Sequence, residues 1–405
     1  MTTTIEARAA DLTDPATFVD GPPHAFLAAL RRDAPVWRHP ATPRHAGFWV
    51  VTRHDDVHDV LLRPTTFVNA YGITIDPDEP AGLPSGEAER GQGALSYTDP
   101  PDHRPLRQLL ARHFTPGRVR ALTPLVDAHA RGLVQRFVDA GGGDFVEAVA
   151  APYPLRVLAA VLDLPAETEA ALHRFVEAPG GDASATAEFL VAVHELAAER
   201  TRQPGDDLIS AMVAGRGEGG ARAAERFGGI LVQLAIAGQE TTRAASGQGV
   251  RLLAEHPDQR AAIARDPATA VPRLVEEVLR LRPPVHYTRR TVSPALDEAP
   301  TIGTDGRARA VEPGDVVYLS IASANRDESV VDDGDRFDAA RTPERSHLSL
   351  GVGAHYCLGA ALARLELRCL FGAVVRSTPD LELTGPTRAE RSAMFDTLAQ
   401  LPLRT

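Results

Sequence analysis

Segments with the pattern of β-strands lie toward both ends of this 405-residue chain, at residues 47–52 and 314–321. The chain between them is mostly helical in pattern, because apolar residues return every three or four positions in residues 119–139, 183–202, 225–253 and 272–282. A sheet built from such distant segments would join both ends of the chain in one unit. The sequence therefore predicts one domain over residues 1–405, mainly α with a small β portion (α+β), whose β-rich part comes from residues 47–70 and 285–325.

The charged residues exclude several classes of protein. Acidic residues outnumber basic ones, 54 to 43, and the net charge is −11, so a general basic field for nucleic acid is absent. All 43 basic residues are arginine, since the chain contains no lysine. This excludes the phosphate loop with its lysine, pyridoxal Schiff bases and lysine aldolases.

The cysteine content and the hydropathy favour a soluble, cytoplasmic protein. Two cysteines, Cys357 and Cys369, cannot form a disulfide framework for a chain of this length, so a reducing compartment is expected. The first fifteen residues have no apolar signal core, and the longest apolar run, around residues 229–238, is too short to span a bilayer.

Cys357 stands where a glycine-rich loop, residues 350–356, runs into a strongly helical segment. The positive field of a helix N-terminus favours a thiolate there. Three interpretations remain open on these residues alone: a buried structural cysteine, a catalytic nucleophile with His355 as its base, and a thiolate ligand to haem iron. Zinc fits poorly, because the spacing of the two cysteines matches no ligand pair.

Three other segments carry charge patterns that are weak signals on their own. Glu277 and Arg280 are three residues apart and His103 and Arg107 four apart, so each pair shares a helix face, although solvated surface pairs look the same. Residues 237–242 place Gly, Glu and two Thr inside an apolar helix. This segment is either a polar turn on an exposed face or a local distortion that opens a groove.

The string HLSLGVGAHYCLGAALARLE at residues 347–366 resembles the haem-binding signature of the cytochrome P450 family, which supplies an axial cysteine. Leu350 stands where the family usually has phenylalanine. Residues 240–241, 277–280 and 103–107 resemble, in the family's order and spacing, its acid–alcohol pair, its Glu-x-x-Arg helix and its His-x-x-x-Arg helix. The likeness spans nearly the whole chain and is to the soluble, bacterial type of the family.

The resemblance implies a role for each matching residue. Glu240 would relay protons from solvent, and Thr241 would direct them to bound oxygen. The ion pair of Glu277 and Arg280 would lock onto Arg341. The residues implied to contact haem b, with Cys357 as the metal ligand, are His103, Arg107, Ala237, Gly238, Arg290 (with Arg289 as the alternate), Leu350, Gly351, His355, Cys357 and Gly359.

The implied fold is a triangular, helix-rich domain that holds haem between the long central helix and the helix of the cysteine loop. The implied activity is that of a haem-thiolate monooxygenase, which uses O2 and two electrons to hydroxylate or otherwise oxidise a hydrophobic small molecule in secondary-metabolite, terpenoid or lipid metabolism. The pocket would be lined by residues 71–96, 165–181 and 285–288 and by Met394 and Phe395.

The partners follow from what the sequence lacks. No flavin or nicotinamide motif is present, so electrons from NAD(P)H would arrive through a ferredoxin and its reductase, and Arg112, Arg345, Arg364 and Arg368 could present a positive docking face. A monomer that binds neither nucleic acid nor membrane is expected. Two alternatives are a peroxide-dependent or non-oxidative haem-thiolate enzyme and a haem protein that binds a ligand without oxygenating it. The acid–alcohol pair speaks against both.

Overall fold

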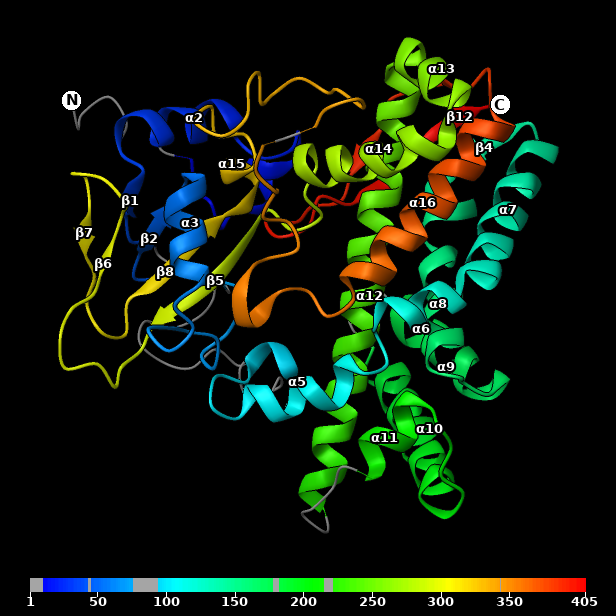
Figure 1. Ribbon diagram of the computed structural model, residues 1–405, viewed down its shortest axis with the longest axis horizontal. Coiled ribbons are helices and arrows are strands. Elements are labelled where there is room, and N and C mark those ends of the chain that lie inside the picture. The colour runs from blue at the N-terminus through cyan, green and yellow to red at the C-terminus, as the bar shows by residue number, and fades with distance from the viewer. Residues whose placement is uncertain (1–9, 43–44, 76–93, 178–181, 215–220, 343) are drawn as a thin grey trace.

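The computed structural model describes residues 10–42, 45–75, 94–177, 182–214, 221–342 and 344–405 (Figure 1). The α-helices in these ranges are α2 (His24–Asp33), α3 (His54–Leu61), α5 (His103–Ala111), α6 (Pro116–Ala121), α7 (Thr123–Asp139), α8 (Pro152–Val161), α9 (Ala166–Glu177), α10 (Ala183–Arg202), α11 (Leu208–Ala214), α12 (Ala221–Glu255), α13 (Pro257–Arg265), α14 (Pro267–Leu281), α15 (Ile321–Ala324) and α16 (Ala360–Ser377). The strands are β1 (Val36–His39), β2 (Phe48–Val51), β3 (Phe67–Val68), β4 (Gly142–Asp144), β5 (Tyr287–Val292), β6 (Thr301–Ile302), β7 (Arg309–Ala310), β8 (Val316–Ser320), β9 (Glu382–Leu383), β10 (Arg388–Ala389), β11 (Leu398–Gln400) and β12 (Pro402–Arg404).

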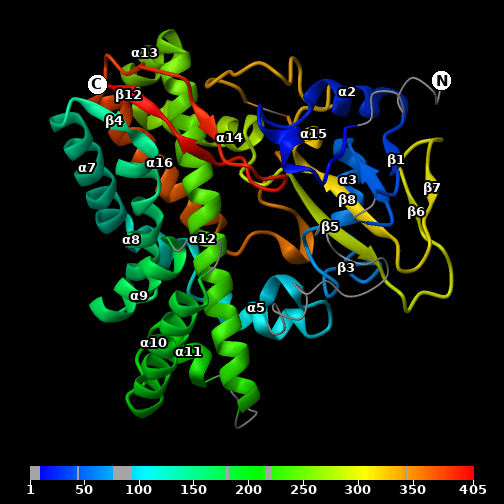
Figure 2. The same ribbon diagram turned by 180° about the vertical axis from the view of Figure 1, so that it is seen from behind.

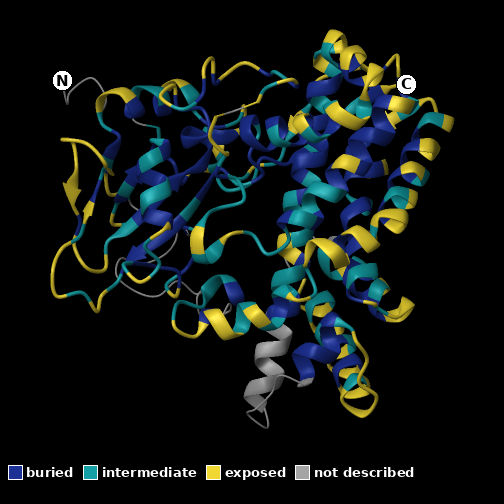
Figure 3. Ribbon diagram, in the orientation of Figure 1, coloured by how far each residue is buried: buried dark blue, intermediate teal, exposed yellow. Residues whose placement is uncertain are grey.

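The strands β1, β2, β8 and β5 gather on one side of the molecule and the long helices on the other, as both views show (Figures 1 and 2). The inner faces of both parts are buried, and the exposed residues lie on outer helix faces, on loops and on strands β6 and β7 at the edge of the molecule (Figure 3). The protein is therefore α+β and mainly helical, as the sequence predicted. Within the described ranges no helix is both long and apolar enough to cross a lipid bilayer.

The main sheet joins the two ends of the chain. Its five strands follow the order β1-β2-β8-β5-β3. Strands β2 and β8 are parallel, with Trp49 aligned with Val317, and the other neighbours are antiparallel. The two strand-like segments found in the sequence, residues 47–52 and 314–321, therefore lie side by side at the centre of one sheet.

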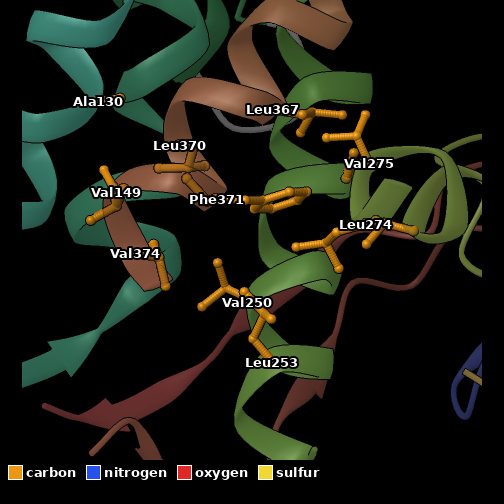
Figure 4. Close-up of a cluster of buried hydrophobic side chains, with 14 of the residues drawn as sticks. Ala130, Val149, Val250, Leu253, Leu274, Val275, Leu367, Leu370, Phe371 and Val374 are labelled. Atoms are coloured by element: carbon orange, nitrogen blue, oxygen red, sulfur yellow. The ribbon is translucent and has the colours of Figure 1, made fainter. Parts of the chain in front are cut away.

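The core of the helical part lies where α16 crosses α12 and α14. The ring of Phe371 on α16 is fully buried. It lies among Val250 and Leu253 of α12 and Leu274 and Val275 of α14, which belong to the same apolar cluster (Figure 4). These contacts fix α16, and with it the loop that carries Cys357, against the central helix.

Close contact between α12 and α16 depends on a glycine. A Cβ atom at Gly249 of α12 would overlap the Phe371 ring of α16. Any other residue there would push the two helices apart, because the closely packed core has no free volume to absorb it.

The structure shows no break in the central helix at residues 237–242, where the sequence suggested either a polar turn or a local distortion. Helix α12 is one continuous α-helix through residues 237–242. The Thr241 hydroxyl donates to the carbonyl oxygen of Ala237, one turn earlier, at 2.6 Å. This bond satisfies the polar side chain within the helix, so no break is needed.

Helix α14 begins earlier than the apolar pattern predicted, at Pro267 instead of residue 272. The Asp266 side chain caps the helix by accepting a hydrogen bond from the Thr269 N–H. Proline at the first helical position needs no N–H partner, so Pro267 fits there. The apolar stripe starts only at Val271, which explains why the pattern missed the first turn.

Candidate active site

A cavity of about 310 Å³ is lined on one side by α12 and on the other by the loop and first turns of α16. It gathers residues from segments that lie far apart in the chain. The residues expected at a haem site that line this cavity are His103, Arg107, Ala237, Gly238, Thr241, Arg290, His355, Cys357 and Gly359. Glu240, Leu350 and Gly351 do not line it, although Leu350 and Gly351 belong to the loop that holds Cys357.

The backbone of the cysteine loop is shaped by two glycines. Gly351 and Gly353 have φ angles of +66° and +68°, a conformation that favours glycine. A Cβ atom at Gly353 would also lie 3.1 Å from Leu62 Cδ2. The loop closes when the N–H of Cys357 donates to the carbonyl oxygen of Leu350 at 2.8 Å. The loop thereby holds Cys357 just before α16.

Burial raises the pKa of the Cys357 thiol, against the expectation that the helix terminus favours a thiolate. A backbone hydrogen bond from Gly359 and the positive charges of Arg107 and Arg364 lower that pKa, but they do not offset burial. The protein alone therefore keeps the sulfur as a thiol. A metal ion deprotonates a coordinating thiol outright, so ligation would supply what the helix terminus does not.

Two histidine rings face each other at the cavity. The rings of His103 on α5 and His355 lie 4.4 Å apart, centre to centre. Burial lowers the pKa of both, that of His355 to about 3, and nearby arginines lower each further. Both are thus neutral at pH 7. The Nε2 atoms of both rings are buried with no hydrogen-bond partner among the described residues.

Two arginines lie beside these rings. Arg107 donates from Nη2 to the carbonyl oxygen of Tyr356 at 2.6 Å. Arg290 on β5 is buried and donates from Nη1 to the Thr288 hydroxyl and to a main-chain carbonyl oxygen. Burial lowers the pKa of Arg290 to about 10, and the charge of Asp99 opposes that shift. Arg290 lines the cavity, whereas Arg289, its neighbour on the alternate face of the strand, does not.

The three residues that the resemblance implied as a structural ion-pair cluster, Glu277, Arg280 and Arg341, lie together in the structure. Arg280 on α14 pairs with Glu277 through Nε and Nη2, at 2.8 and 2.9 Å. Arg341 Nε lies 3.3 Å from the same carboxylate. Glu277 and Arg280 are almost fully buried. Arg280 also donates to the carbonyl oxygen of Gly334 at 2.7 Å, so the cluster ties α14 to the chain leading to the cysteine loop.

Glu240, the acid of the acid–alcohol pair, is the first of three charged residues that extend from the interior toward the protein surface. Glu240 Oε1 lies 3.6 Å from Arg243 Nη1, and Arg243 Nη2 lies 2.6 Å from Glu390 Oε1. Burial raises the pKa of Glu240, Arg243 opposes that shift, and the nearby Glu390 charge adds to it. The Glu390 side chain is more exposed than that of Glu240, so the three residues lead from the interior to the surface.

Sequence reasoning missed the partner of Arg364. Glu276 on α14 forms two hydrogen bonds with Arg364 of α16, at 2.7 and 2.8 Å, and lies 3.2 Å from His347 Nε2. Burial would raise the pKa of Glu276, but the bonds from Arg364 and His347 lower it to about 2. Arg364 also donates to the Tyr356 hydroxyl. The pair therefore fixes the cysteine loop instead of presenting a free charge.

A second missed residue is Glu366 of α16, which lines the cavity and is buried. Burial raises its pKa well above the ordinary value, and its Oε2 atom has no partner in the described part of the chain. The signal was present in the sequence, because Leu362, Glu366 and Leu370 are spaced by four and share one helix face.

The expected pocket segments contribute in part. Leu95, Ser96 and Thr288 line the cavity, whereas Met394 and Phe395 do not. Of the expected segment 71–96, residues 76–93 lie outside the described residues, as do residues 178–181 of the segment 165–181.

The cavity residues fit a haem. The two buried histidine Nε2 atoms without partners, together with Arg107 and Arg290, are suited to bind the two carboxylates of a porphyrin. Cys357 offers a sulfur ligand at the same cavity. Within the described residues no group of three or more His, Cys, Asp or Glu side chains could hold a metal ion by itself. A helical fold that brings one cysteine and a basic cluster to one cavity defines a haem-thiolate protein.

Comparison with known proteins identifies the family. A family model for cytochrome P450 matches residues 183–378. A steroid C26-monooxygenase of Rhodococcus jostii is 31% identical over 402 residues, covering 95% of this chain and 82% of the relative. Linalool 8-monooxygenase of Pseudomonas putida is 31% identical over 407 residues, covering 96% and 97%. A Mycobacterium marinum cytochrome P450 solved with pseudoionone superposes with a TM-score of 0.83 at 29% identity, covering 98% of both chains.

The chain belongs to the cytochrome P450 family. It is a haem-thiolate monooxygenase, an oxidoreductase whose family binds haem through a cysteine thiolate and uses O2. P450 relatives act on hydrophobic molecules with the help of redox partners.

Proposed function

We propose that Cys357 is the axial ligand of the haem iron in this enzyme. The observation that carries the proposal is the shared cavity, in which the thiol of Cys357 meets two arginines and two histidines with unpartnered nitrogens. When bound there, haem b supplies the activation of O2 and the transfer of one oxygen atom to the substrate.

The carboxylates of the haem are held by His103, His355, Arg107 and Arg290. Neutral imidazoles donate one N–H each, and the arginines donate charged hydrogen bonds. Ala237 and Gly238 of α12 line the cavity opposite the cysteine loop, and a single methyl group on one and no side chain on the other leave room for a flat ring system. Leu350 and Gly351 act through the loop backbone that positions Cys357.

Proton delivery is assigned to Glu240 and Thr241. Because burial raises its pKa, Glu240 can hold a proton at a higher pH than an exposed glutamate. Arg243 and Glu390 connect this carboxyl group to the surface. The Thr241 hydroxyl donates its own proton to the Ala237 carbonyl oxygen, so its oxygen keeps its acceptor capacity and can orient a proton-carrying group in the cavity by accepting a hydrogen bond from it.

Electrons from NAD(P)H are proposed to arrive through a ferredoxin and its reductase. Of the four arginines first considered for docking, Arg345 pairs with Asp55 and Arg364 with Glu276. Arg112 and Arg368 bond only to a histidine and a main-chain carbonyl among the described residues. Their charges are thus uncompensated and suit an acidic partner on the side of Cys357.

The substrate is proposed to be a hydrophobic terpenoid or steroid. Relatives that resemble this chain over nearly its whole length are named for steroid and linalool oxidation. The walls above Thr241 carry apolar side chains, among them Ile73, Leu95, Ile230 and Leu234. Both cysteines are unpaired in the structure, which suits an enzyme of the reducing cytoplasm.

The ligand assignment is tested with Cys357→His and the control Cys369→Ser. Wild-type holoprotein and Cys369→Ser should both show the reduced carbon-monoxide difference band of thiolate-ligated haem. Cys357→His should lose that band while it still binds pigment. A band that survives in Cys357→His would contradict the assignment, and so would wild-type protein that stays colourless when haem precursor is supplied.

A further inference from the structure

Part of the cavity lining is a continuous polar chain, which we name the Ser96 triad: Asn69, Ser96 and Gln233. All three residues line the cavity. The Gln233 Nε2 atom donates to the Ser96 hydroxyl oxygen in a short contact. The Asn69 Nδ2 atom donates to the Ser96 carbonyl oxygen at 2.8 Å. The triad thus joins the segment after β3, the segment before α5, and α12.

The bonds within the triad fix which of its atoms remain available. A carbonyl oxygen can only accept, so the Asn69 amide must direct its nitrogen at Ser96 and keep its Oδ1 as an acceptor. That Oδ1 is buried without a partner in the described part of the molecule, and Asn69 is only 2% exposed. The Ser96 hydroxyl accepts from Gln233 and so retains its own proton, and Gln233 retains Oε1.

The donors and acceptors that the triad leaves available lie among apolar side chains, which determines their cost in free energy. Leu95 flanks Ser96, and Ile230 and Leu234 flank Gln233 on the cavity wall. A polar group that is enclosed by apolar side chains without a partner costs about 1–3 kcal/mol in proteins. A ligand that supplies the missing partner recovers that free energy, and a ligand that is purely hydrocarbon does not.

We propose that the Ser96 triad anchors a hydroxyl group of the substrate. The Ser96 O–H donates to the oxygen of that hydroxyl, and its proton is accepted by Gln233 Oε1 or by Asn69 Oδ1. The substrate is therefore an apolar molecule that already carries an alcohol, which narrows the hydrophobic substrates of the proposed function and rests on that function.

The position of the triad also sets where oxidation occurs. Gln233, Ala237 and Thr241 are spaced by four and face the same cavity. Gln233 precedes Thr241 by two turns, about 12 Å along the axis of α12. A molecule held at Gln233 presents to Thr241 a carbon remote from its hydroxyl, so the product is a diol with well-separated oxygens.

The test uses the holoenzyme and matched probes: cyclododecanol with cyclododecane and its methyl ether, 1-adamantanol with adamantane, and menthol with p-menthane. Binding is read from the spin-state shift of the haem spectrum, without turnover. Each alcohol should bind about tenfold more tightly than its hydrocarbon, since one hydrogen bond to a buried group has about that effect. The methyl ether should bind more weakly than the alcohol, because its oxygen can accept from Ser96 but it has no proton to donate to Gln233 or Asn69.

Two variants test the residues themselves. Gln233→Leu and Ser96→Ala should each reduce the preference for the alcohol to less than about threefold. Gln135→Leu, at an exposed glutamine of α7 that bonds to Asp139, is the matched control and should keep the preference.

The carbon-monoxide band separates failure of this inference from failure of the proposed function. If the band is present but alcohols and hydrocarbons bind equally, or no probe of any pair binds, the hydroxyl anchor is wrong and the haem assignment stands. If Ser96→Ala retains the full preference, the anchor is likewise wrong. If the band is missing, the ligand assignment itself fails.

Discussion

The Nη2 atom of Arg107 lies 2.6 Å from the carbonyl oxygen of Tyr356, the residue directly before Cys357. The bond joins α5 to the peptide that carries the cysteine. Arg107 also lines the cavity, so one guanidinium both positions the loop and is offered to a haem carboxylate. Two functions of the site, sulfur placement and carboxylate binding, therefore depend on a single side chain.

Arg107→Ala should loosen haem binding. It removes a charged hydrogen bond to the loop, an interaction of about 1.5–3 kcal/mol, and one donor to a carboxylate. The rate of haem transfer to apomyoglobin should rise by at least about tenfold. Arg104→Ala, at an exposed position of the same helix, is the control and should leave the rate unchanged. Equal rates for both variants would refute the role of Arg107.

Arg280→Ala should prevent accumulation of folded holoprotein. It leaves the Glu277 carboxylate buried and deprived of its closest partner, at a cost of about 3–5 kcal/mol. The measurement is the yield of soluble, pigmented protein and its urea midpoint. Arg251→Ala removes a half-exposed pair with Glu255 and should cost less than about 1 kcal/mol. Normal pigment loading of Arg280→Ala would show that the cluster is dispensable.

Thr241→Ala should separate electron consumption from product formation. Without its hydroxyl, residue 241 no longer directs protons to bound oxygen. A larger share of the electrons from NADPH should therefore form hydrogen peroxide instead of product. The ratio of product to NADPH, measured with ferredoxin and reductase, should fall several-fold. Thr201→Ala removes the same kind of hydroxyl-to-carbonyl bond from α10 and should keep the ratio. Unchanged coupling in Thr241→Ala would remove Thr241 from proton delivery.

Glu366→Gln should stabilise the protein increasingly as pH rises. Burial raises the pKa of Glu366 in the folded state, so above about pH 4.5 folding must keep a proton that the unfolded chain releases. Wild-type stability therefore falls with pH relative to the variant, by about 1.4 kcal/mol per pH unit until the folded pKa is reached. Urea unfolding between pH 5 and 8 measures the difference. A difference that is constant across this range would mean that Glu366 is not held protonated.

The parts of the site whose residues lie close together in the chain could be predicted from the sequence. The glycine loop and Cys357 are contiguous, and Glu277 and Arg280 lie on one helix turn, so each set could be matched to a family motif within a single segment, and the resemblance gave it a role. The apolar pattern of residues 225–253 predicted α12. The doubt about residues 237–242 arose because threonine is a weak helix former by propensity, whereas the compensating bond from Thr241 to Ala237 cannot be seen in composition.

The parts that several segments build were not predictable. Arg364 was expected to present its charge to a partner protein, but Glu276 on another helix neutralises it. The Ser96 triad brings three distant positions together, none of which belongs to a motif. Such contacts depend on how the helices and the sheet pack, and a linear pattern carries no information about that packing.

The parallel pairing of β2 with β8 has a consequence for synthesis of the protein. Trp49 leaves the ribosome long before its partner Val317 is translated. Until then, the edge of β2 that will pair with β8 has no hydrogen-bonding partner strand. Contacts of such long sequence separation form slowly and expose strand edges in the meantime. The nascent N-terminal segment therefore exposes this strand edge until β8 is made, and truncation before β8 should yield aggregates rather than a smaller folded protein.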